Sequence, residues 1–295
     1  MSESESSGDG GVQHTATDGT ATGGDTAVNG AMSGGDTTTD GDEHRRPPVT
    51  ATLPVARLER ALAAVEAVAE ECLFHFEPGA LRVEATDPAQ VALATVTVDA
   101  AAFDRYEADG TTVGVDAGRL SELVGVAAGD DPVTLAVDPA TWHLDVRLPE
   151  LSYGVAALDP DSVLSPPDRE ELAFPYTADC TLPVAEIERF VGAVDLVADY
   201  ATLAVDPTEP AFLVRADGDT DEVSVRLAEE DLPALSPGSA ESLFSLVYLD
   251  EVTRAIPGGT DVALRLGEDC PVRFEYGFAD GDGTVETLVS PRIQR

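Results

Sequence analysis

Residues 52–70 read TLPVARLERALAAVEAVAE, and residues 181–199 read TLPVAEIERFVGAVDLVAD. Eleven of these nineteen aligned positions are identical, and the two segments lie 129 positions apart. The same offset aligns RLSELVGVAAGDDPVTL at 119–135 with YLDEVTRAIPGGTDVAL at 248–264. Two matches that are far apart in a chain rarely share one offset by chance, so we interpret the chain as two copies of one fold.

Each copy shows the same pattern of predicted secondary structure. A short strand at 49–53 leads to a proline in the first turn of an amphipathic helix over 54–70, and 183–199 repeats that helix. The apolar stripes of the two helices are Leu58, Leu62, Val65 and Ala69, and then Ile187, Val191, Val194 and Ala198. A shorter helix, expected over 116–128 and over 248–256, is followed by alternating strands. This pattern predicts an α+β fold with two helices on one face of an antiparallel sheet in each copy.

The composition divides the chain into four regions. Residues 1–48 are mostly Gly, Ser, Thr and Asp, with too little apolar surface to offset the entropy of ordering, and are predicted to be a disordered tail. The tail is open to interpretation as a binding arm, a solvated spacer or the product of a misassigned start codon. The other predicted regions are the N-terminal copy at 49–158, an interdomain connector at 159–176 and the C-terminal copy at 177–295.

The charge of the chain is extreme. It carries 56 Asp and Glu against 17 basic residues, a formal charge of −39, and all the basic residues are arginine. The absence of lysine excludes Walker-type phosphate loops, Schiff-base and pyridoxal phosphate enzymes. Self-repulsion on this scale is tolerable where molar salt shortens the Debye length to about 3 Å, so we expect a salt-rich cytoplasm. An acidic protein that binds cations or basic partners is the alternative.

The sequence offers no motif for catalysis, a metal or a cofactor. The acidic runs 217–221 and 280–283 lack the Gly and Glu of a calcium loop and are predicted to be hairpin turns. Cys72, Cys180 and Cys270 form no CxxC pair and are expected to be buried, and Trp142 is expected to be a packing residue. The chain contains neither an apolar run of 18 residues nor a signal pattern, so we expect no membrane contact.

Several segments resemble the DNA sliding clamp, the proliferating cell nuclear antigen family, and especially its haloarchaeal members. They are EATDPAQVALATV at 84–96, LSYGVAALDPDS at 151–162, GDTDEVSVRL at 218–227, SLFSLVYLDEVTRAIP at 242–257 and SPRIQ at 290–294. The resemblance covers 49–295 and implies a homotrimeric ring of two-domain subunits whose helices line a central hole. It implies a processivity factor that encircles duplex DNA without reading its sequence, tethers enzymes and catalyses nothing.

The resemblance also implies three sets of functional residues. The residues that would face DNA are Arg60, Arg119, Arg189 and Arg254, although Glu59, Glu66, Glu122, Gly125 and Gly192 stand where many relatives are basic. The residues that would bind hydrophobic peptides of DNA polymerase, clamp loader, ligase and nuclease are Gln90, Val91, Leu93, Val163, Leu164, Pro271, Ser290, Pro291 and Ile293. The residues that would join subunits, by pairing strand 152–157 with strand 222–227, are Ser152, Tyr153, Val155, Val223, Val225 and Leu227.

Two other functions remain open from the sequence. A diverged clamp-like protein, acting as a scaffold or as one subunit of a hetero-oligomer, would explain the sparse arginines and the long tail. An acidic hydrolase is the alternative from the enzyme class, and no motif supports it.

Overall fold

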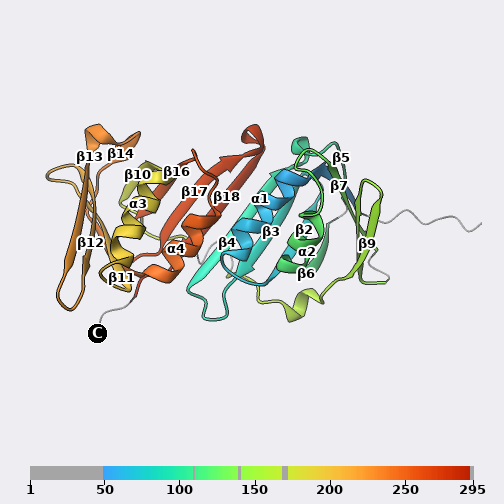
Figure 1. Ribbon diagram of the computed structural model, residues 1–295, viewed down its shortest axis with the longest axis horizontal. Coiled ribbons are helices and arrows are strands. Elements are labelled where there is room, and N and C mark those ends of the chain that lie inside the picture. Colours follow the sequence, from blue (N-terminus) through green and yellow to red (C-terminus); the bar gives the residue numbers. More distant parts are fainter. Residues whose placement is uncertain (1–48, 109, 139–140, 168–171, 293–295) are drawn as a thin grey trace, which may run out of the picture. The chain divides into compact units, whose positions relative to one another are not determined.

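The computed structural model describes residues 49–108, 110–138, 141–167 and 172–292 (Figure 1). The predicted disordered tail and Ile293 lie outside the described residues. Everything below refers to the described part of the chain.

The four predicted helices are present, with shifted ends. They are α1 (Val55–Glu66), α2 (Ala117–Val124), α3 (Val184–Asp195) and α4 (Leu246–Ala255). Pro54 and Pro183 do not enter the first turn but occupy the N-cap positions with extended backbone. The second helix was predicted too long at its C-terminal end, because α2 gives way to a turn at Gly125, a poor helix former. In the second copy α4 starts two residues earlier than predicted and ends before Ile256, which is extended ahead of Pro257.

Nine strands in each copy form three antiparallel sheets. In the N-terminal copy they are β1 (Val49–Pro54), β2 (Glu71–Glu77), β3 (Ala80–Thr86), β4 (Ala92–Asp99), β5 (Arg105–Glu107), β6 (Thr111–Asp116), β7 (Pro132–Asp138), β8 (His143–Leu148) and β9 (Leu151–Ala156). In the C-terminal copy they are β10 (Ala178–Pro183), β11 (Tyr200–Asp206), β12 (Ala211–Asp217), β13 (Glu222–Ala228), β14 (Ala234–Ser236), β15 (Ala240–Ser245), β16 (Asp261–Leu266), β17 (Val272–Phe278) and β18 (Gly283–Val289). Single 3-10 turns occupy Ala100–Ala102, Pro160–Ser162, Glu229–Asp231 and Ala279–Gly281.

The sheet order makes the repeat visible. The sheets run β5-β1-β7-β8-β9, then β14-β10-β16-β17-β18-β4-β3-β2-β6, and then β13-β12-β11-β15. The nine-stranded sheet is a five-stranded unit of the second copy joined to a four-stranded unit of the first through the antiparallel pair β4 and β18. The prediction of tandem α+β copies on antiparallel sheets is therefore confirmed.

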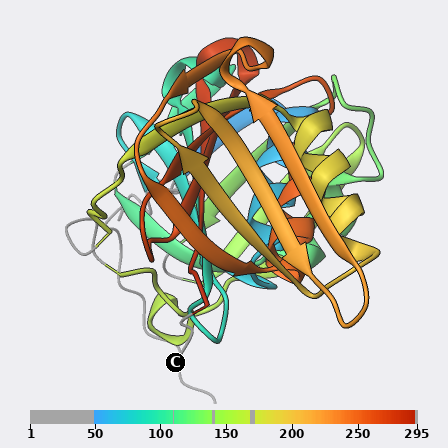
Figure 2. The ribbon, with the colours of Figure 1, turned by 90° about the vertical axis from the view of Figure 1, so that its left-hand side faces the viewer.

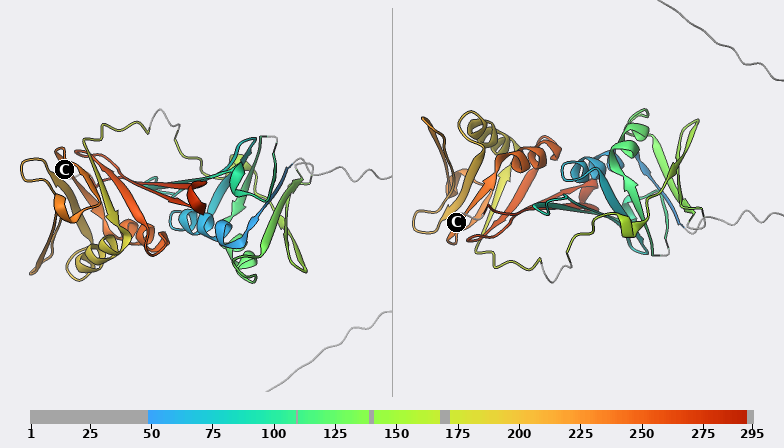
Figure 3. Two further views of the ribbon diagram at one scale, coloured as in Figure 1. Left: turned by 90° about the horizontal axis from the view of Figure 1, so that it is seen from above. Right: turned by 90° about the horizontal axis from the view of Figure 1, so that it is seen from below.

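The helices cover one face of these sheets, and the connector crosses the opposite face (Figure 3). Leu58, Leu62 and Val65 are fully buried under α1, as the apolar stripe predicted. Ala69 lies beyond the end of α1 but still packs against the core. The core consists largely of Val, Leu and Ala with a few Phe side chains, in keeping with the low aromatic content of the chain.

Two further predictions concern single residues. The three cysteines are buried and free, as expected. The expectation that Trp142 is a packing residue is wrong, because this side chain is 46% exposed. Trp142 has a left-handed backbone with φ of 51° in the turn between β7 and β8, which places it outside the pleat of either strand.

The two acidic runs form turns, as predicted. Gly218 donates its backbone N–H to the Asp221 carbonyl at 2.8 Å in the connection from β12 to β13. The connection from β17 to β18 passes through Asp280 and Gly281, both with positive φ. Neither run therefore needs a bound cation to explain its sequence.

Candidate functional site

The first candidate surface is the outward face of the four helices. Within this layer α1 packs against α2, α3 packs against α4, and α1 also contacts α4 across the junction of the copies. The four predicted DNA-facing arginines, Arg60, Arg119, Arg189 and Arg254, lie on these helices and are exposed. Arg60 on α1 and Arg189 on α3 occupy equivalent positions in the two copies.

Most of this positive charge is already paired. Arg119 Nη1 lies 3.4 Å from Glu122 Oε2, Arg189 Nε donates to Glu186 Oε2 at 2.9 Å, and Arg254 Nη2 lies 2.7 Å from Asp250 Oδ2. Among the described residues Arg60 has no such carboxylate partner. The four helices together carry five arginines and eight acidic residues. The helical face is therefore net negative, and strong attraction to phosphates at low salt is not expected from it.

The second candidate surface is a groove of about 200 Å³ at the junction of the two copies. Its floor contains Leu93 of β4 and Leu288 of β18, which are directly opposite each other in the strand pair that joins the copies. The other lining residues are Thr86, Gln90, Val91, Ala92, Pro167, Leu172, Phe174, Pro271 and Ser290. Both copies and the connector thus contribute to one apolar depression.

The loop that forms one wall of the groove is organised by a buried carboxylate. Asp87 accepts backbone N–H groups from Ala89, Val91 and Ala92 at 3.0, 2.6 and 2.6 Å. The hydroxyl of Tyr248, on α4, donates to the same carboxylate at 3.0 Å. This carboxylate therefore links the groove wall to the helical layer.

The C-terminal segment is tied to the same wall. Ser290 donates its backbone N–H to the Val91 carbonyl at 2.7 Å, and this bond continues the pairing of β18 with β4 beyond the strand ends. Of the predicted peptide-binding residues, the structure brings together Gln90, Val91, Leu93, Pro271 and Ser290. These five residues come from both copies.

Three other predicted peptide-binding residues lie elsewhere. Val163 is only 5% exposed and packs against Gly114, where an added Cβ would come within 2.7 Å of the valine Cγ2. The side chain of Val163 therefore fills space beside β6 and does not line the groove. Leu164 is 40% exposed but does not line the groove, and Pro291 lines a neighbouring pocket with Arg292. Ile293 lies outside the described residues.

Sequence reasoning missed Pro167, Leu172 and Phe174, which form the connector wall. The signal was present as the apolar stretch Leu172 to Phe174 in a connector that is otherwise mostly polar. The neighbouring Tyr176 extends this wall, and its ring lies 6.0 Å from the Phe174 ring.

The predicted subunit-interface residues lie on two edge strands. β9 is the edge strand of the five-stranded sheet, and β13 is an edge strand of the four-stranded sheet. The four-stranded sheet, drawn in gold and orange, faces the viewer in Figure 2. Tyr153, Val155, Val223 and Val225 are half-buried against the core, and Leu227 is buried. Ser152 is exposed on the other face of β9.

Comparison with known proteins matches this geometry. Residues 52–146 match the family described as proliferating cell nuclear antigen, N-terminal domain. The DNA polymerase sliding clamp of Haloarcula marismortui is 40% identical over 237 residues, which are 80% of this chain and 95% of that protein. The sliding clamp of Natronomonas pharaonis gives the same identity and coverage. This chain belongs to the DNA polymerase sliding clamp family.

The solved structures agree with this assignment. The clamp in the structure described as the C-terminal region of FEN-1 bound to A. fulgidus PCNA has a TM-score of 0.76 and 27% identity to this chain. The match covers 84% of this chain and 99% of that one. Sliding clamps are non-catalytic processivity factors. No helix in the described ranges is long and apolar enough to cross a membrane.

Proposed function

We propose that three copies of this chain close into a ring around duplex DNA and tether DNA polymerase and other replication and repair enzymes to it. One observation carries the proposal: the strands equivalent to the pair that joins the two copies inside the chain have no partner on their outer sides among the described residues. β4 pairs with β18 within the chain, and their counterparts β13 and β9 are edge strands. Unpaired edges of this kind invite a further strand.

The internal junction gives the register of the external one. Leu135 and Leu264 are equivalent residues of the two copies, and their partners on the next strand are Val146 and Phe274. One strand further, Val146 pairs with Tyr153 and Phe274 pairs with Thr287. Tyr153 of β9 is therefore the counterpart of Thr287 of β18.

The same reasoning applies to the other strand. Glu84 and Arg215 are equivalent because they lie opposite Leu73 and Thr202, which are 129 positions apart. Their partners on the next strand are Thr95 of β4 and Ser224 of β13. Because Glu286 pairs with Thr95 inside the chain, its counterpart Ser152 pairs with Ser224 of the next subunit.

This register brings apolar side chains together on the core-facing side. Tyr153 lies opposite Val223, and Leu151, which is exposed in the single chain, lies opposite Val225. On the outer face this register brings Glu150, in the turn before β9, to Arg226, whose guanidinium already lies 3.6 Å from Glu209 in its own subunit. The contact uses different surfaces on the two subunits, and such a contact closes into a ring when its rotation divides a full turn.

Because the helical face is net negative, we propose that the ring stays on DNA by encircling it and not by binding its phosphates. A face with more acids than arginines gains little from phosphate contacts, and those contacts weaken further as salt rises. A closed ring needs no such contacts, because it can leave the duplex only at an end. Among the described residues Arg60 is the most available cation for the passing backbone.

The groove is the proposed docking site for partner enzymes, through a short peptide whose apolar side chains cover Leu93 and Leu288. The relative bound to the C-terminal region of FEN-1 supports this assignment. Gln90, Val91, Pro271 and Ser290 would form its rim. As a member of a family of non-catalytic processivity factors, the chain is assigned no enzymatic activity in this proposal.

A polymerase assay on primed circular DNA in molar KCl tests the function. We expect the chain to increase the length of DNA that the polymerase synthesises in one binding event. We also expect the chain to dissociate from linear DNA, by sliding off the ends, and to stay on circular DNA. Tyr153→Glu, which places a charge opposite Val223, should abolish both effects, while Glu188→Gln on the exposed face of α3 should not. Unchanged product length with the wild-type chain would instead identify it as a scaffold that does not encircle DNA.

A further inference from the structure

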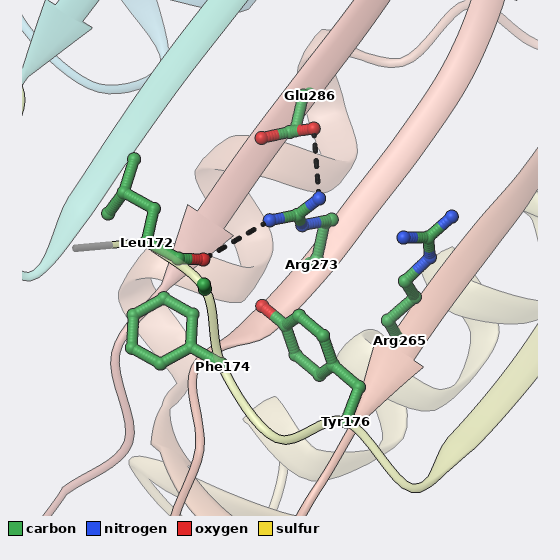
Figure 4. A pocket seen from close by; sticks show the side chains of 7 residues that line it. Leu172, Phe174, Tyr176, Arg265, Arg273 and Glu286 are labelled. Atoms are coloured by element: carbon green, nitrogen blue, oxygen red, sulfur yellow. Dashed lines mark hydrogen bonds and ion pairs between the residues drawn. The ribbon is translucent and has the colours of Figure 1, made fainter. Parts of the chain in front are cut away.

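A second pocket, of about 350 Å³, lies between the connector and the outer face of the C-terminal sheet (Figure 4). It is lined by Leu172, Ala173, Phe174, Tyr176, Arg265, Arg273 and Glu286. The guanidinium of Arg273, from β17, and the hydroxyl of Tyr176 face the pocket, and Arg265 of β16 stands to one side of them (Figure 4). In a chain with a formal charge of −39 such a cluster of hydrogen-bond donors is unusual.

The guanidinium of Arg273 is held in place from three sides. Nη1 lies 3.2 Å from Glu286 Oε2, and Nη2 donates to the Leu172 carbonyl at 3.5 Å. The guanidinium carbon lies 5.3 Å from the centre of the Tyr176 ring. These contacts fix its orientation and leave Nε unused.

Two buried polar atoms in the pocket have no hydrogen-bond partner among the described residues. They are Arg273 Nε and Tyr176 Oη. Burial raises the pKa of the Tyr176 hydroxyl, and the Arg273 guanidinium partly opposes this through its charge and its closeness to the hydroxyl oxygen, so the hydroxyl keeps its proton at neutral pH. An arginine always carries its Nε proton. Both atoms are therefore donors, and a buried donor without an acceptor is costly.

The remaining charges leave room for an anionic group. Arg265 stands at the rim, 3.3 Å from Asp179 and 3.9 Å from Glu275, in exposed ion pairs that contribute little. Glu286 is turned to Arg273 and does not reach the two free donors. A carboxylate has two oxygens that accept hydrogen bonds, and bonds from a charged guanidinium are about twice as strong as neutral ones.

The pocket and the apolar groove share one wall. Leu172 and Phe174 line both, so the flank of a peptide that covers Leu288 in the groove would lie next to the pocket. We propose that this pocket receives the carboxylate of an Asp or Glu that flanks the apolar residues of a partner peptide. The inference rests on the proposed function, because it adds an acidic determinant to the same docking site.

The high acidity of the chain makes this determinant specific. An acidic peptide is repelled by the rest of the surface at low salt, but at about 1 M salt the Debye length falls to about 3 Å and only direct contacts remain. Two converging donors then distinguish an acid at one position of the peptide from acids elsewhere.

The experiment uses synthetic peptides that copy the C-terminal segment of FEN-1, with Glu placed in turn at each position flanking the apolar residues and with Gln as the isosteric control. Binding to the full chain is measured by calorimetry in molar KCl. We expect one position at which Glu binds about tenfold more tightly than Gln, the gain from one charge-assisted hydrogen bond. At the other positions Glu and Gln should bind equally.

Variants assign the preference to the pocket. Tyr176→Phe removes one donor and keeps the ring under Arg273, so the Glu preference should fall to about threefold or less while Gln peptides bind as before. Arg265→Gln should lower it less. Arg215→Gln, an equally exposed arginine on β12 that is paired with Glu241, should leave it unchanged.

The outcomes separate the two proposals. If Gln peptides bind but Glu gives no advantage at any position, or if Tyr176→Phe leaves a Glu preference intact, the acidic determinant is refuted and the groove stands. If no peptide binds, the groove assignment itself fails. Unfolding midpoints measured for each variant show that a lost preference is not lost folding.

Discussion

The register between subunits yields the sharpest prediction. We expect the double variant Ser152→Cys with Ser224→Cys to form disulfides between neighbouring copies. Within the chain the equivalent residues Glu286 and Thr95 are direct partners of an antiparallel pair. Directly opposite residues of such a pair have Cα atoms about 4.5–5.5 Å apart, within the span that a disulfide accepts.

A shift in register changes this geometry measurably. A residue two positions along the same face, such as Glu222, lies diagonally at about 7–8 Å, beyond the range of an unstrained disulfide. A shift of one residue turns the two side chains to opposite faces. The native thiols do not interfere, because burial raises the pKa of each of them, that of Cys180 to about 12, and the thiolate is the reactive form.

Oxidation followed by gel electrophoresis without reductant reads out the result. Ser152→Cys with Ser224→Cys should give a band at three times the 30.7 kDa chain mass, since each ring closes with three crosslinks. Either single variant should remain monomeric on the gel, as should the diagonal control Ser152→Cys with Glu222→Cys.

A crosslinked ladder in the diagonal control, with none in the direct pair, would show that the internal junction is not the template for the external one. A ladder that continues past three chains would show that the contact does not close. Either result would refute the reasoning from equivalent strands.

Three further predictions address the groove wall, the open edge and the outer sheet face. Asp87→Ala should destabilise the chain by about 3 kcal/mol, because three backbone N–H groups and the Tyr248 hydroxyl lose a buried acceptor, and should weaken peptide binding in calorimetry. Trp142, the only tryptophan, lies beside the end of the edge strand β9. Its fluorescence should therefore shift to shorter wavelength as the protein concentration is raised, because ring assembly removes water from that edge. Burial raises the pKa of Glu84, but hydrogen bonds from a neighbouring imidazole and guanidinium outweigh it and lower the pKa overall. The ionised Glu84 therefore stabilises the fold above its unfolded pKa, and this stabilisation is lost as the pH falls through its folded pKa. Glu84→Gln should lower the free energy of unfolding by about 1–2 kcal/mol at pH 7 and leave it unchanged at pH 2. Urea titrations at the two pH values measure this difference.

The repeat, the helices and the class of fold were predictable because each rests on a local pattern. The stripe of Leu58, Leu62 and Val65 requires only a period of 3.6 residues, and the prolines mark both helix starts. The pairing of β4 with β18 was not predictable from these patterns. It joins residues that are 185 to 197 positions apart, from Val98 with Gly283 to Ala92 with Val289, and alternation alone does not choose a partner strand.

The groove was predicted in part, and the residues whose positions differ from the prediction all belong to the connector or follow the last strand. Gln90, Val91 and Leu93 belong to or adjoin a strand, so their placement follows from its alternation. Val163 and Phe174 belong to an irregular connector, where no period says which side chain turns inward. Val163 turns inward because Gly114, which has no side chain, leaves space for it. That space forms only when β6 and the connector pack together.

The two junctions of the proposed ring share a backbone register but differ in chemistry. On the outer face of the internal junction Leu93 lies opposite Leu288, and these two side chains form the groove floor. Their counterparts across the subunit boundary are Glu222 and Gly154, a charge and a missing side chain. The connector supplies the other wall of the groove, and among the described residues no segment corresponds to it at that boundary. A ring of six similar units therefore offers three docking grooves and not six, and the number of partners that it can hold at once follows from these few substitutions.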